Sequence, residues 1–264
     1  MAELTGTNAL VTGGGSGIGL ACARHLAADG ATVTLMGRMM ERLEAGAAEV
    51  EAAAPGATVR LHAADAADED AVAAAVAVAA GDDALDVVVL AAGQGAGGSL
   101  VDTDRAAWDA VLATNLTGPM LAIKHAAPKM TGGGSIVALS SIAGVLTHRL
   151  MTAYCVSKAG LEMLVRNAAD ELGAVGIRVN AVRPSLVPTE LASGLSESPP
   201  IVADYLEQMP LGRLGTTDDI ASLVRFLCGP GSTWITGQCI AADGGHTLRR
   251  GPDLAGAMAR AQET

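Results

Sequence analysis

Residues 12–19 read Thr-Gly-Gly-Gly-Ser-Gly-Ile-Gly and lie between an apolar run at 8–11 and an alanine-rich run at 17–28. The first run is typical of a buried strand and the second of a helix. Glycines at such a turn permit positive φ angles and let backbone amides approach a phosphate at the helix N-terminus. The stretch therefore predicts a phosphate-binding turn at the start of an α/β fold, with a plain tight turn as the alternative.

The same alternation of short apolar runs and helical runs continues along the chain. Strands are predicted at 32–36, 58–62, 85–90, 135–139, 178–182 and 238–241, and helices at 39–53, 68–80, 105–126, 151–172, 201–209 and 218–228. Near-continuous apolar strands between helices indicate a parallel sheet that is covered on both faces. We expect one α/β domain over residues 1–264, a doubly wound Rossmann-type fold with about seven parallel strands and helices on both faces.

Two segments depart from this rhythm. Residues 186–210 start irregularly, with prolines and serines ahead of a helical stretch, and are expected to form a substrate loop at one end of the sheet. The tail at 246–264 is polar and alanine-rich, which is consistent with a disordered end or with an arm that reaches another subunit. Arg249 and Arg250 in the tail are expected to be a solvated pair; contact with a phosphate-bearing carrier is the alternative.

Composition limits the partners and the compartment. The formal net charge of −11 disfavours nucleic acid and anionic membrane surfaces, since both repel a negative protein. The four cysteines form no Cys-x-x-Cys pair and the five histidines are scattered, so we expect reduced thiols and no metal site. The N-terminal residues lack a signal-peptide pattern and no apolar run is long enough to span a bilayer, so we expect a cytoplasmic protein.

The glycine-rich turn favours a dinucleotide over ATP. It lacks the Gly-Lys-Ser/Thr ending of a P-loop, although its Gly13, Gly17 and Gly19 also depart from the usual G-x-G-x-x-G spacing. A carboxylate after the second strand would hold the ribose of NAD, whereas an arginine accommodates the 2′-phosphate of NADP. Arg38 follows that strand and no Asp or Glu occurs at 31–40, which predicts NADP(H) as the preferred cofactor, with NAD(H) possible. A solvated arginine is the alternative for Arg38.

Tyr154 and Lys158 are one helical turn apart on the helix predicted at 151–172. A phenol has an ordinary pKa of about 10, and a neighbouring ammonium group lowers it by favouring the phenolate. Tyr154 is therefore a candidate general acid or base, although a surface Tyr–Lys pair is the alternative for these two residues in isolation. Ser141, after the strand at 135–139, and Asn115 are expected to lie near the same sheet edge.

In this order and spacing, the motifs resemble the short-chain dehydrogenase/reductase (SDR) family over nearly the whole chain. The matching pieces are Thr12–Gly19, Asp65, Ala92-Gly93, Asn115, Ser141, Tyr154 with Lys158, Asn180 through Pro184, Thr189 and Asp243-Gly244-Gly245. The interval from serine to tyrosine selects Ser141 over Ser140, which is expected to support the end of the strand.

The resemblance implies a role for each member of the catalytic set. Tyr154 exchanges the proton with the carbonyl oxygen, and Ser141 hydrogen-bonds that oxygen. Lys158 lowers the pKa of Tyr154 and binds the nicotinamide ribose, and Asn115 holds a water in the proton relay. The implied cofactor contacts are Gly13, Gly15, Ser16, Gly17, Ile18, Gly19, Arg38, Asp65, Ala66, Ala92, Gly93, Tyr154, Lys158, Pro184, Ser185, Val187 and Thr189. Among them, Asp65 bonds the adenine amino group and Thr189 contacts the carboxamide.

The sequence departs from the family pattern at two places. Leu90-Ala91-Ala92-Gly93 stands where the family usually has Asn-Asn-Ala-Gly, so Leu90 and Ala91 replace two asparagines, which puts local packing in doubt more than the chemistry. Ser185 follows Pro184 where the family usually has glycine, so a side chain near the nicotinamide could alter its seating or narrow the substrate entrance.

The expected function is hydride transfer between NADP(H) and a carbonyl or alcohol substrate, as in a ketone reductase or a 3-oxoacyl-type reductase. Apolar residues in segments 94–100, 144–151 and 186–209 weakly favour an apolar substrate, and deletion of the tail is expected to spare activity on small ketones. The alternatives are an NAD-dependent alcohol dehydrogenase of the same family, an enoyl-thioester reductase and, from another class, a non-catalytic dinucleotide sensor. By resemblance, we expect a homotetramer or a homodimer.

Overall fold

A parallel sheet of seven strands forms the centre of the computed structural model, which describes residues 3–262. The strands are β1 (Asn8–Thr12), β2 (Thr32–Gly37), β3 (Val59–Ala63), β4 (Val87–Leu90), β5 (Gly134–Leu139), β6 (Ile177–Pro184) and β7 (Cys239–Ala242). Their order, β3-β2-β1-β4-β5-β6-β7, reverses direction between β1 and β4. The predicted doubly wound α/β domain is therefore confirmed, and its cleft lies where the order reverses.

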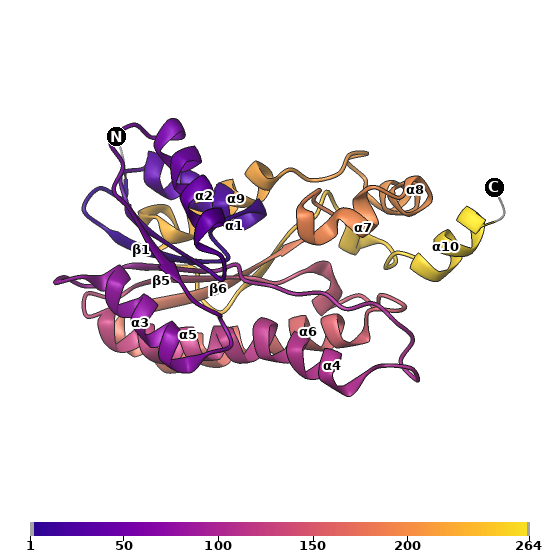
Figure 1. Ribbon diagram of the computed structural model, residues 1–264, viewed down its shortest axis with the longest axis horizontal. Coiled ribbons are helices and arrows are strands. Elements are labelled where there is room, and N and C mark those ends of the chain that lie inside the picture. Colours follow the sequence, from indigo (N-terminus) through magenta and orange to yellow (C-terminus); the bar gives the residue numbers. More distant parts are fainter. Residues whose placement is uncertain (1–2, 263–264) are drawn as a thin grey trace.

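Helices cover both faces of the sheet (Figure 1). They are α1 (Gly17–Ala28), α2 (Met40–Ala53), α3 (Glu69–Ala80), α4 (Arg105–Leu112), α5 (Gly118–Ala126), α6 (Thr152–Leu172), α7 (Ser193–Ser196), α8 (Pro199–Gln208), α9 (Thr217–Cys228) and α10 (Leu254–Gln262). Helices α1, α2 and α9 lie on one face and α3 to α6 on the other, with a buried apolar cluster on each side. The strands are apolar on both faces because both are covered. None of the helices among residues 3–262 has both the length and the apolar character of a membrane span.

The helix predicted at 105–126 is interrupted. A π-helical turn, Ala113–Thr117, joins α4 to α5 and contains Asn115, whose side chain is fully buried. Such turns insert an extra residue into a helix and are frequent at functional sites. The interruption changes the direction in which Asn115 faces, which helical periodicity alone does not show.

The tail is ordered over the described residues, through 262. It forms α10, whose Leu254 and Ala257 are buried in a third apolar cluster with Tyr205 of α8. Arg250 is exposed, as the sequence predicts, but it also pairs with a buried carboxylate. Its guanidinium donates to both oxygens of the buried Asp204 carboxylate, at 3.1 and 2.7 Å, because that carboxylate would otherwise lack a counter-charge.

The glycine-rich turn depends on close backbone contact. A Cβ on Gly19 would lie 2.3 Å from the carbonyl oxygen of Gly13, and a Cβ on Gly13 would lie 2.8 Å from the amide nitrogen of Ala92. Gly13 also has a φ of +66°, which disfavours other residues. The first turn of α1 can therefore lie against β1 and β4 only without side chains at these positions.

Gly19→Ala should destabilise the protein by about 1–3 kcal/mol, because the added methyl meets a backbone oxygen that cannot move away cheaply. Thermal and denaturant unfolding would measure the loss. Gly132→Ala is the matched control, since a Cβ there meets nothing within 4 Å and its φ is ordinary. Equal stability of the two variants would show that the turn can shift enough to accommodate a methyl group at position 19.

Arg250→Ala should lower the free energy of unfolding by about 2 kcal/mol, because it leaves the buried Asp204 carboxylate without its charged donor. It should also increase protease cleavage near α10, which limited proteolysis would detect. Arg249→Ala is the control, since Arg249 contacts only the exposed side of α8, at the backbone oxygen of Glu207. Wild-type stability and cleavage in Arg250→Ala would mean that the apolar contacts of α10 hold the tail alone.

Candidate active site

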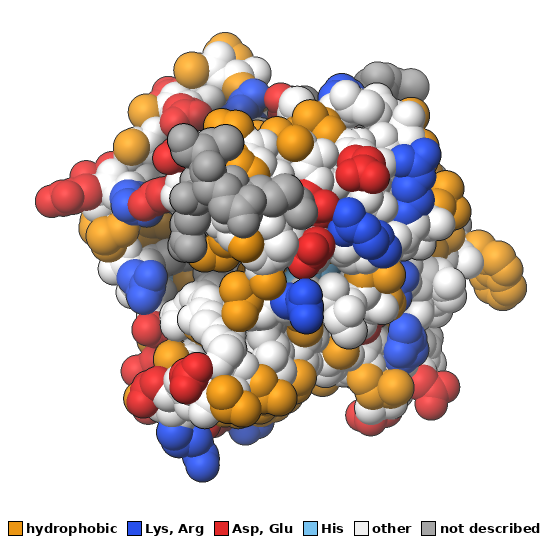
Figure 2. All heavy atoms as spheres, turned by 90° about the vertical axis from the view of Figure 1, so that its right-hand side faces the viewer, with side chains coloured by type: hydrophobic (Ala, Val, Ile, Leu, Met, Phe, Trp, Pro, Cys, Tyr) orange, Lys and Arg blue, Asp and Glu red, His pale blue; other side chains and the backbone are white. Residues whose placement is uncertain are grey.

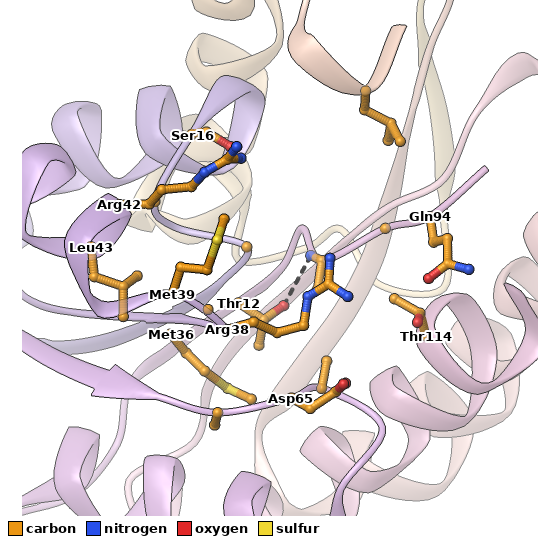
Figure 3. A pocket seen from close by; sticks show the side chains of 18 of the residues that line it. Thr12, Ser16, Met36, Arg38, Met39, Arg42, Leu43, Asp65, Gln94 and Thr114 are labelled. Carbon is orange, nitrogen blue, oxygen red and sulfur yellow. Dashed lines mark hydrogen bonds between the residues drawn. The ribbon is translucent and has the colours of Figure 1, made fainter. Parts of the chain in front are cut away.

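A cavity of about 310 Å³ opens at the carboxyl ends of β1, β2 and β4 (Figure 3). It gathers most of the predicted cofactor residues of the first half of the chain: Gly13, Gly15, Ser16, Arg38, Asp65, Ala66, Ala92 and Gly93. Ser16 precedes α1 without capping it through its side chain, so the first amides of the helix stay available to a ligand. Bare amides beside a glycine-lined wall fit a pyrophosphate, which agrees with the predicted dinucleotide site.

Two arginines border this cavity. Arg38 extends into it from the end of β2 and makes no ion pair with any residue between 3 and 262 (Figure 3). Arg42, on the first turn of α2, donates two hydrogen bonds of 2.7 Å to the carboxylate of Glu190. These bonds raise the pKa of Arg42 and lower that of Glu190. Glu190 lies in the loop after β6, so the pair crosses the mouth of the cavity.

Sequence reasoning missed Arg42 and Glu190. Arg42 follows Arg38 by four residues, but α2 begins only at Met40, so the two do not share a helix face and their closeness in the sequence was the only signal for a second cation. Glu190 had no such signal, because only the fold brings its loop to α2. Thr189, predicted as a cofactor contact, does lie at the glycine-rich turn, 3.3 Å from the position of a Cβ on Gly17.

A second cavity, of about 160 Å³, adjoins the first, since Gly93 and Leu191 line both. It brings together the predicted Ser141, Tyr154 and Lys158 with Pro184 at the end of β6 and with Ser185, Val187 and Thr189 from the loop that follows. Other predicted residues lie elsewhere: Asn115, Gly17 and Gly19 line neither cavity, and Ile18 lines only the second.

Lys158 is held beside Tyr154. Its ammonium donates to the backbone oxygen of Leu139 at 2.7 Å and lies 5.6 Å from the centre of the Tyr154 ring. Burial lowers the pKa of Lys158 to about 8, against a smaller opposing effect of Glu162. A lysine so placed changes charge within the range in which enzymes usually work.

The pKa of Tyr154 differs from the prediction. Burial raises it above its ordinary value, with a smaller opposing effect from the hydroxyl of Ser141. The lowering expected from Lys158 is not seen, because the phenol and the ammonium are desolvated together and a charged phenolate is costly there. Tyr154 is therefore protonated at neutral pH and can donate a proton to a bound oxygen.

Asn115 connects two elements that border the site. Its amide accepts from the backbone N–H of Gln94 at 2.8 Å and donates to Gln94 O and to the hydroxyl of Ser157, at 2.8 and 3.0 Å. Ser157 lies beside Lys158 on α6. The side chain of Asn115 thus joins the loop after β4 to the helix that carries Tyr154.

Ser140 has the supporting position that the sequence predicts. Its hydroxyl donates to the buried carboxylate of Glu162 at 2.8 Å, and that carboxylate also accepts two bonds from Arg183, at 2.5 and 2.6 Å. The network joins the ends of β5 and β6 to α6. Ser141, the neighbouring residue, is left to face the cavity.

Both departures from the family pattern have structural counterparts. The backbone amides of Ala91 and Ala92 donate to the hydroxyl of Thr12, at 3.1 and 3.2 Å, so the end of β4 is tied without asparagine side chains. Ser185 pairs with Nδ1 of His246 at 2.8 Å. The Nε2 of His246 donates to the carbonyl of Arg250, so Ser185 donates to Nδ1 and its hydroxyl is directed at the tail.

Known proteins resemble the chain over most of its length. Residues 13–247 match a family model described as enoyl-(acyl carrier protein) reductase. A galactitol 2-dehydrogenase (L-tagatose-forming) from Cereibacter sphaeroides is 36% identical over 250 residues, which cover 93% of this chain and 97% of the relative.

Solved structures agree with this similarity. A short-chain type dehydrogenase/reductase from Mycobacterium ulcerans is 40% identical with a TM-score of 0.94, covering 98% of this chain and 96% of its own. A gluconate 5-dehydrogenase from Burkholderia cenocepacia, in complex with NADP and tartrate, is 28% identical with a TM-score of 0.88; the match covers 94% of this chain and 98% of that one.

Proposed function

Because the chain belongs to the short-chain dehydrogenase/reductase family and is an oxidoreductase acting on CH–OH or C=O groups, we propose that it moves a hydride between NADP(H) and a small, largely apolar alcohol or ketone. The observation that carries the proposal is the meeting of Ser141, Tyr154 and Lys158 in a cavity that adjoins the dinucleotide-shaped cleft. The cofactor and the substrate class are parts of the proposal.

In the proposed mechanism, NADPH supplies the hydride when it is bound. Ser141 hydrogen-bonds the carbonyl oxygen of the substrate and so orients it toward Tyr154. Tyr154, protonated at neutral pH, donates its proton to that oxygen as negative charge develops there. Lys158 stabilises the phenolate that forms, and Asn115 keeps the loop after β4 and helix α6 in register around the site.

The choice of NADP(H) rests on the positive charge at the adenosine end of the cleft. Arg38 and Arg42 both line the cavity there, together with Asp65, the expected contact of the adenine. A planar guanidinium is well suited to a phosphate, since it donates two parallel hydrogen bonds. Glu190 is the one carboxylate beside Arg42, and a bound 2′-phosphate would compete with it for that guanidinium.

Two further features belong to the proposal. We expect a homotetramer or homodimer, supported by exposed apolar side chains on the outer helices, such as Met163 and Val156 of α6. We also expect a cytoplasmic location, which the four free cysteines support, because unpaired thiols are typical of reducing compartments.

Enoyl-thioester reduction is the second candidate, favoured by the description of the matching family model. The complete set of Ser141, Tyr154 and Lys158 favours carbonyl chemistry instead, because reduction of a carbonyl group requires a donor that protonates its oxygen. Incubation with an enone and analysis of the products separates the two: carbonyl chemistry gives an allylic alcohol, and enoyl chemistry gives a saturated ketone.

Substitution of the arginines tests the cofactor. Wild type should bind NADPH far more tightly than NADH, and Arg38→Ala should remove about tenfold or more of that advantage by deleting a charged donor to the 2′-phosphate. Arg42→Ala should remove a smaller part, because Glu190 shares that guanidinium. Fluorescence titration with both cofactors measures the ratio. Equal affinity for NADH in wild type would refute the assignment of Arg38.

Tyr154→Phe should lower kcat for ketone reduction by about 10²- to 10⁴-fold while NADPH binding stays unchanged, since only the proton donor is lost. In wild type, kcat/KM should be level from about pH 6 to 8 and fall above Lys158's pKa of about 8, as deprotonation removes the charge that stabilises the phenolate. The pH profile of Lys158→Met is the control. If the fall near pH 8 persisted in that variant, it would belong to another group.

A further inference from the structure

Two polar side chains face the substrate cavity without a part in the mechanism. His148 lies in the loop before α6 and Tyr205 lies on α8; they are 6% and 3% exposed. Both line the same cavity as Ser141 and Tyr154. Polar groups this deeply buried are nearly always hydrogen-bonded, so the atoms they leave unpaired point to a ligand.

The hydrogen bonds of His148 fix its tautomer. Its Nδ1 lies 3.0 Å from the carbonyl oxygen of Leu146, and since a carbonyl only accepts, Nδ1 carries the proton. Burial lowers the pKa of the ring, which is therefore neutral at physiological pH. Nε2 then bears a lone pair and has no donor among residues 3–262. His148 presents an acceptor, with no positive charge.

Tyr205 presents the complementary group. Its ring packs edge-on against His246, with the centroids 5.4 Å apart, and burial keeps the phenol protonated by raising its pKa. Its hydroxyl has no hydrogen bond to any described residue. Within that part of the chain, Thr34 Oγ1 is the only fully enclosed side-chain N or O without a partner, so the free atoms of Tyr205 and His148 border open space.

The remaining walls of the cavity are mostly apolar, and their polar side chains, Ser140, Ser185 and Thr189, are uncharged. The apolar residues include Ile142, Met151, Leu186 and Leu195, and the only charged side chain that lines the cavity is Lys158, which is already bonded to Leu139. A buried carboxylate or phosphate on the substrate would lack a counter-charge here, which is costly. On the outer face at this end of the molecule, acidic, basic and apolar side chains are intermingled (Figure 2).

We propose that the substrate is a small neutral molecule with an apolar body and a hydroxyl group on the carbon next to the reacting one. That hydroxyl donates to Nε2 of His148 and accepts from the phenol of Tyr205, which satisfies both groups at once. The adjacent position follows from the small size of the cavity, about 160 Å³, because Tyr154 and Tyr205 both line it and the two oxygens that they bind must therefore lie close together. A vicinal diol is therefore oxidised to a hydroxyketone, or the hydroxyketone is reduced to the diol.

The size of the cavity agrees with this class. The cavity is small, about 160 Å³, and expected nicotinamide contacts such as Pro184 and Thr189 share its wall, which favours a compact substrate. In oxidation, the reacting carbon loses a hydride to NADP⁺, and its hydroxyl loses a proton to the phenolate form of Tyr154, so oxidation is assayed at alkaline pH, where that form is populated. The second hydroxyl stays unchanged. The inference rests on the proposed function and adds the substrate class to it.

The test compares the oxidation of cyclohexane-1,2-diol, cyclohexanol and 2-hydroxycyclohexanecarboxylate by the purified protein with NADP⁺. Wild type should show kcat/KM about tenfold or more higher for the diol than for cyclohexanol, since each unpaired buried group costs about one such factor. The carboxylate should be the poorest of the three. A higher kcat/KM for the carboxylate than for the diol would overturn the neutral assignment.

Variants assign the preference to the two residues. Tyr205→Phe keeps the ring against His246 and removes only the hydroxyl, and His148→Phe removes the acceptor. Each should cut the diol preference about fivefold or more and leave cyclohexanol within about threefold. His148→Gln, which retains an acceptor, should restore part of the preference. Met151→Leu is the matched apolar control and should change both alcohols in parallel.

The outcomes separate this inference from the function on which it rests. If cyclohexanol is oxidised in a Tyr154-dependent way but the diol is no better, the assignment of His148 and Tyr205 fails and the proposed function stands. If none of these alcohols, and neither cyclohexanone nor 2-hydroxycyclohexanone in the reverse direction, reacts while the cofactor binds, the proposed function fails, and the substrate class with it. An unchanged diol preference in both Phe variants also overturns the assignment.

Discussion

The site depends on the junction between β1 and β4, at which the order of the sheet reverses. One hydroxyl, that of Thr12, accepts from two successive amides of the neighbouring strand end, and the turn that follows admits α1 only because Gly13 and Gly19 lack side chains. Adjacent strands that lead to opposite sides leave a crevice at their carboxyl ends. Every group that we assign to the cofactor or the substrate lies along this crevice or on the loops that border it.

The chemistry then follows from desolvation rather than from charge pairing. Burial raises the pKa of Tyr154 and lowers that of Lys158, so both environments disfavour ions before a substrate is present. A proton donor that stays neutral suits reduction, because it is ready to give its proton when charge develops on the carbonyl oxygen. Burial also strengthens the hydrogen bonds that the neutral His148 and Tyr205 offer a substrate, since the low local dielectric makes each bond electrostatically stronger than in water.

The sequence was sufficient for the residues whose spacing lies within one element. Tyr154 and Lys158 are one helical turn apart on α6, and Arg38 directly follows β2. Helical periodicity and the predicted end of a strand were therefore enough to locate them. Other features needed the fold. Arg42 and Glu190 meet across the cleft from elements far apart in the chain, and the direction of the Tyr154 pKa depends on how completely the ring is enclosed. The order of the tail also depended on a contact between distant residues, Arg250 and Asp204.

That contact gives the tail a role in the site. Asp204 precedes Tyr205 on α8, so the residue that Arg250 holds is the neighbour of the phenol that lines the substrate cavity. The same stretch of tail receives the hydrogen bond of His246, which in turn fixes Ser185 beside the site and packs on the Tyr205 ring. The substrate wall is therefore assembled from α8, the loop after β6 and the tail together. A change in the tail should therefore act on substrate recognition through Tyr205 and on the nicotinamide end of the cofactor site through Ser185.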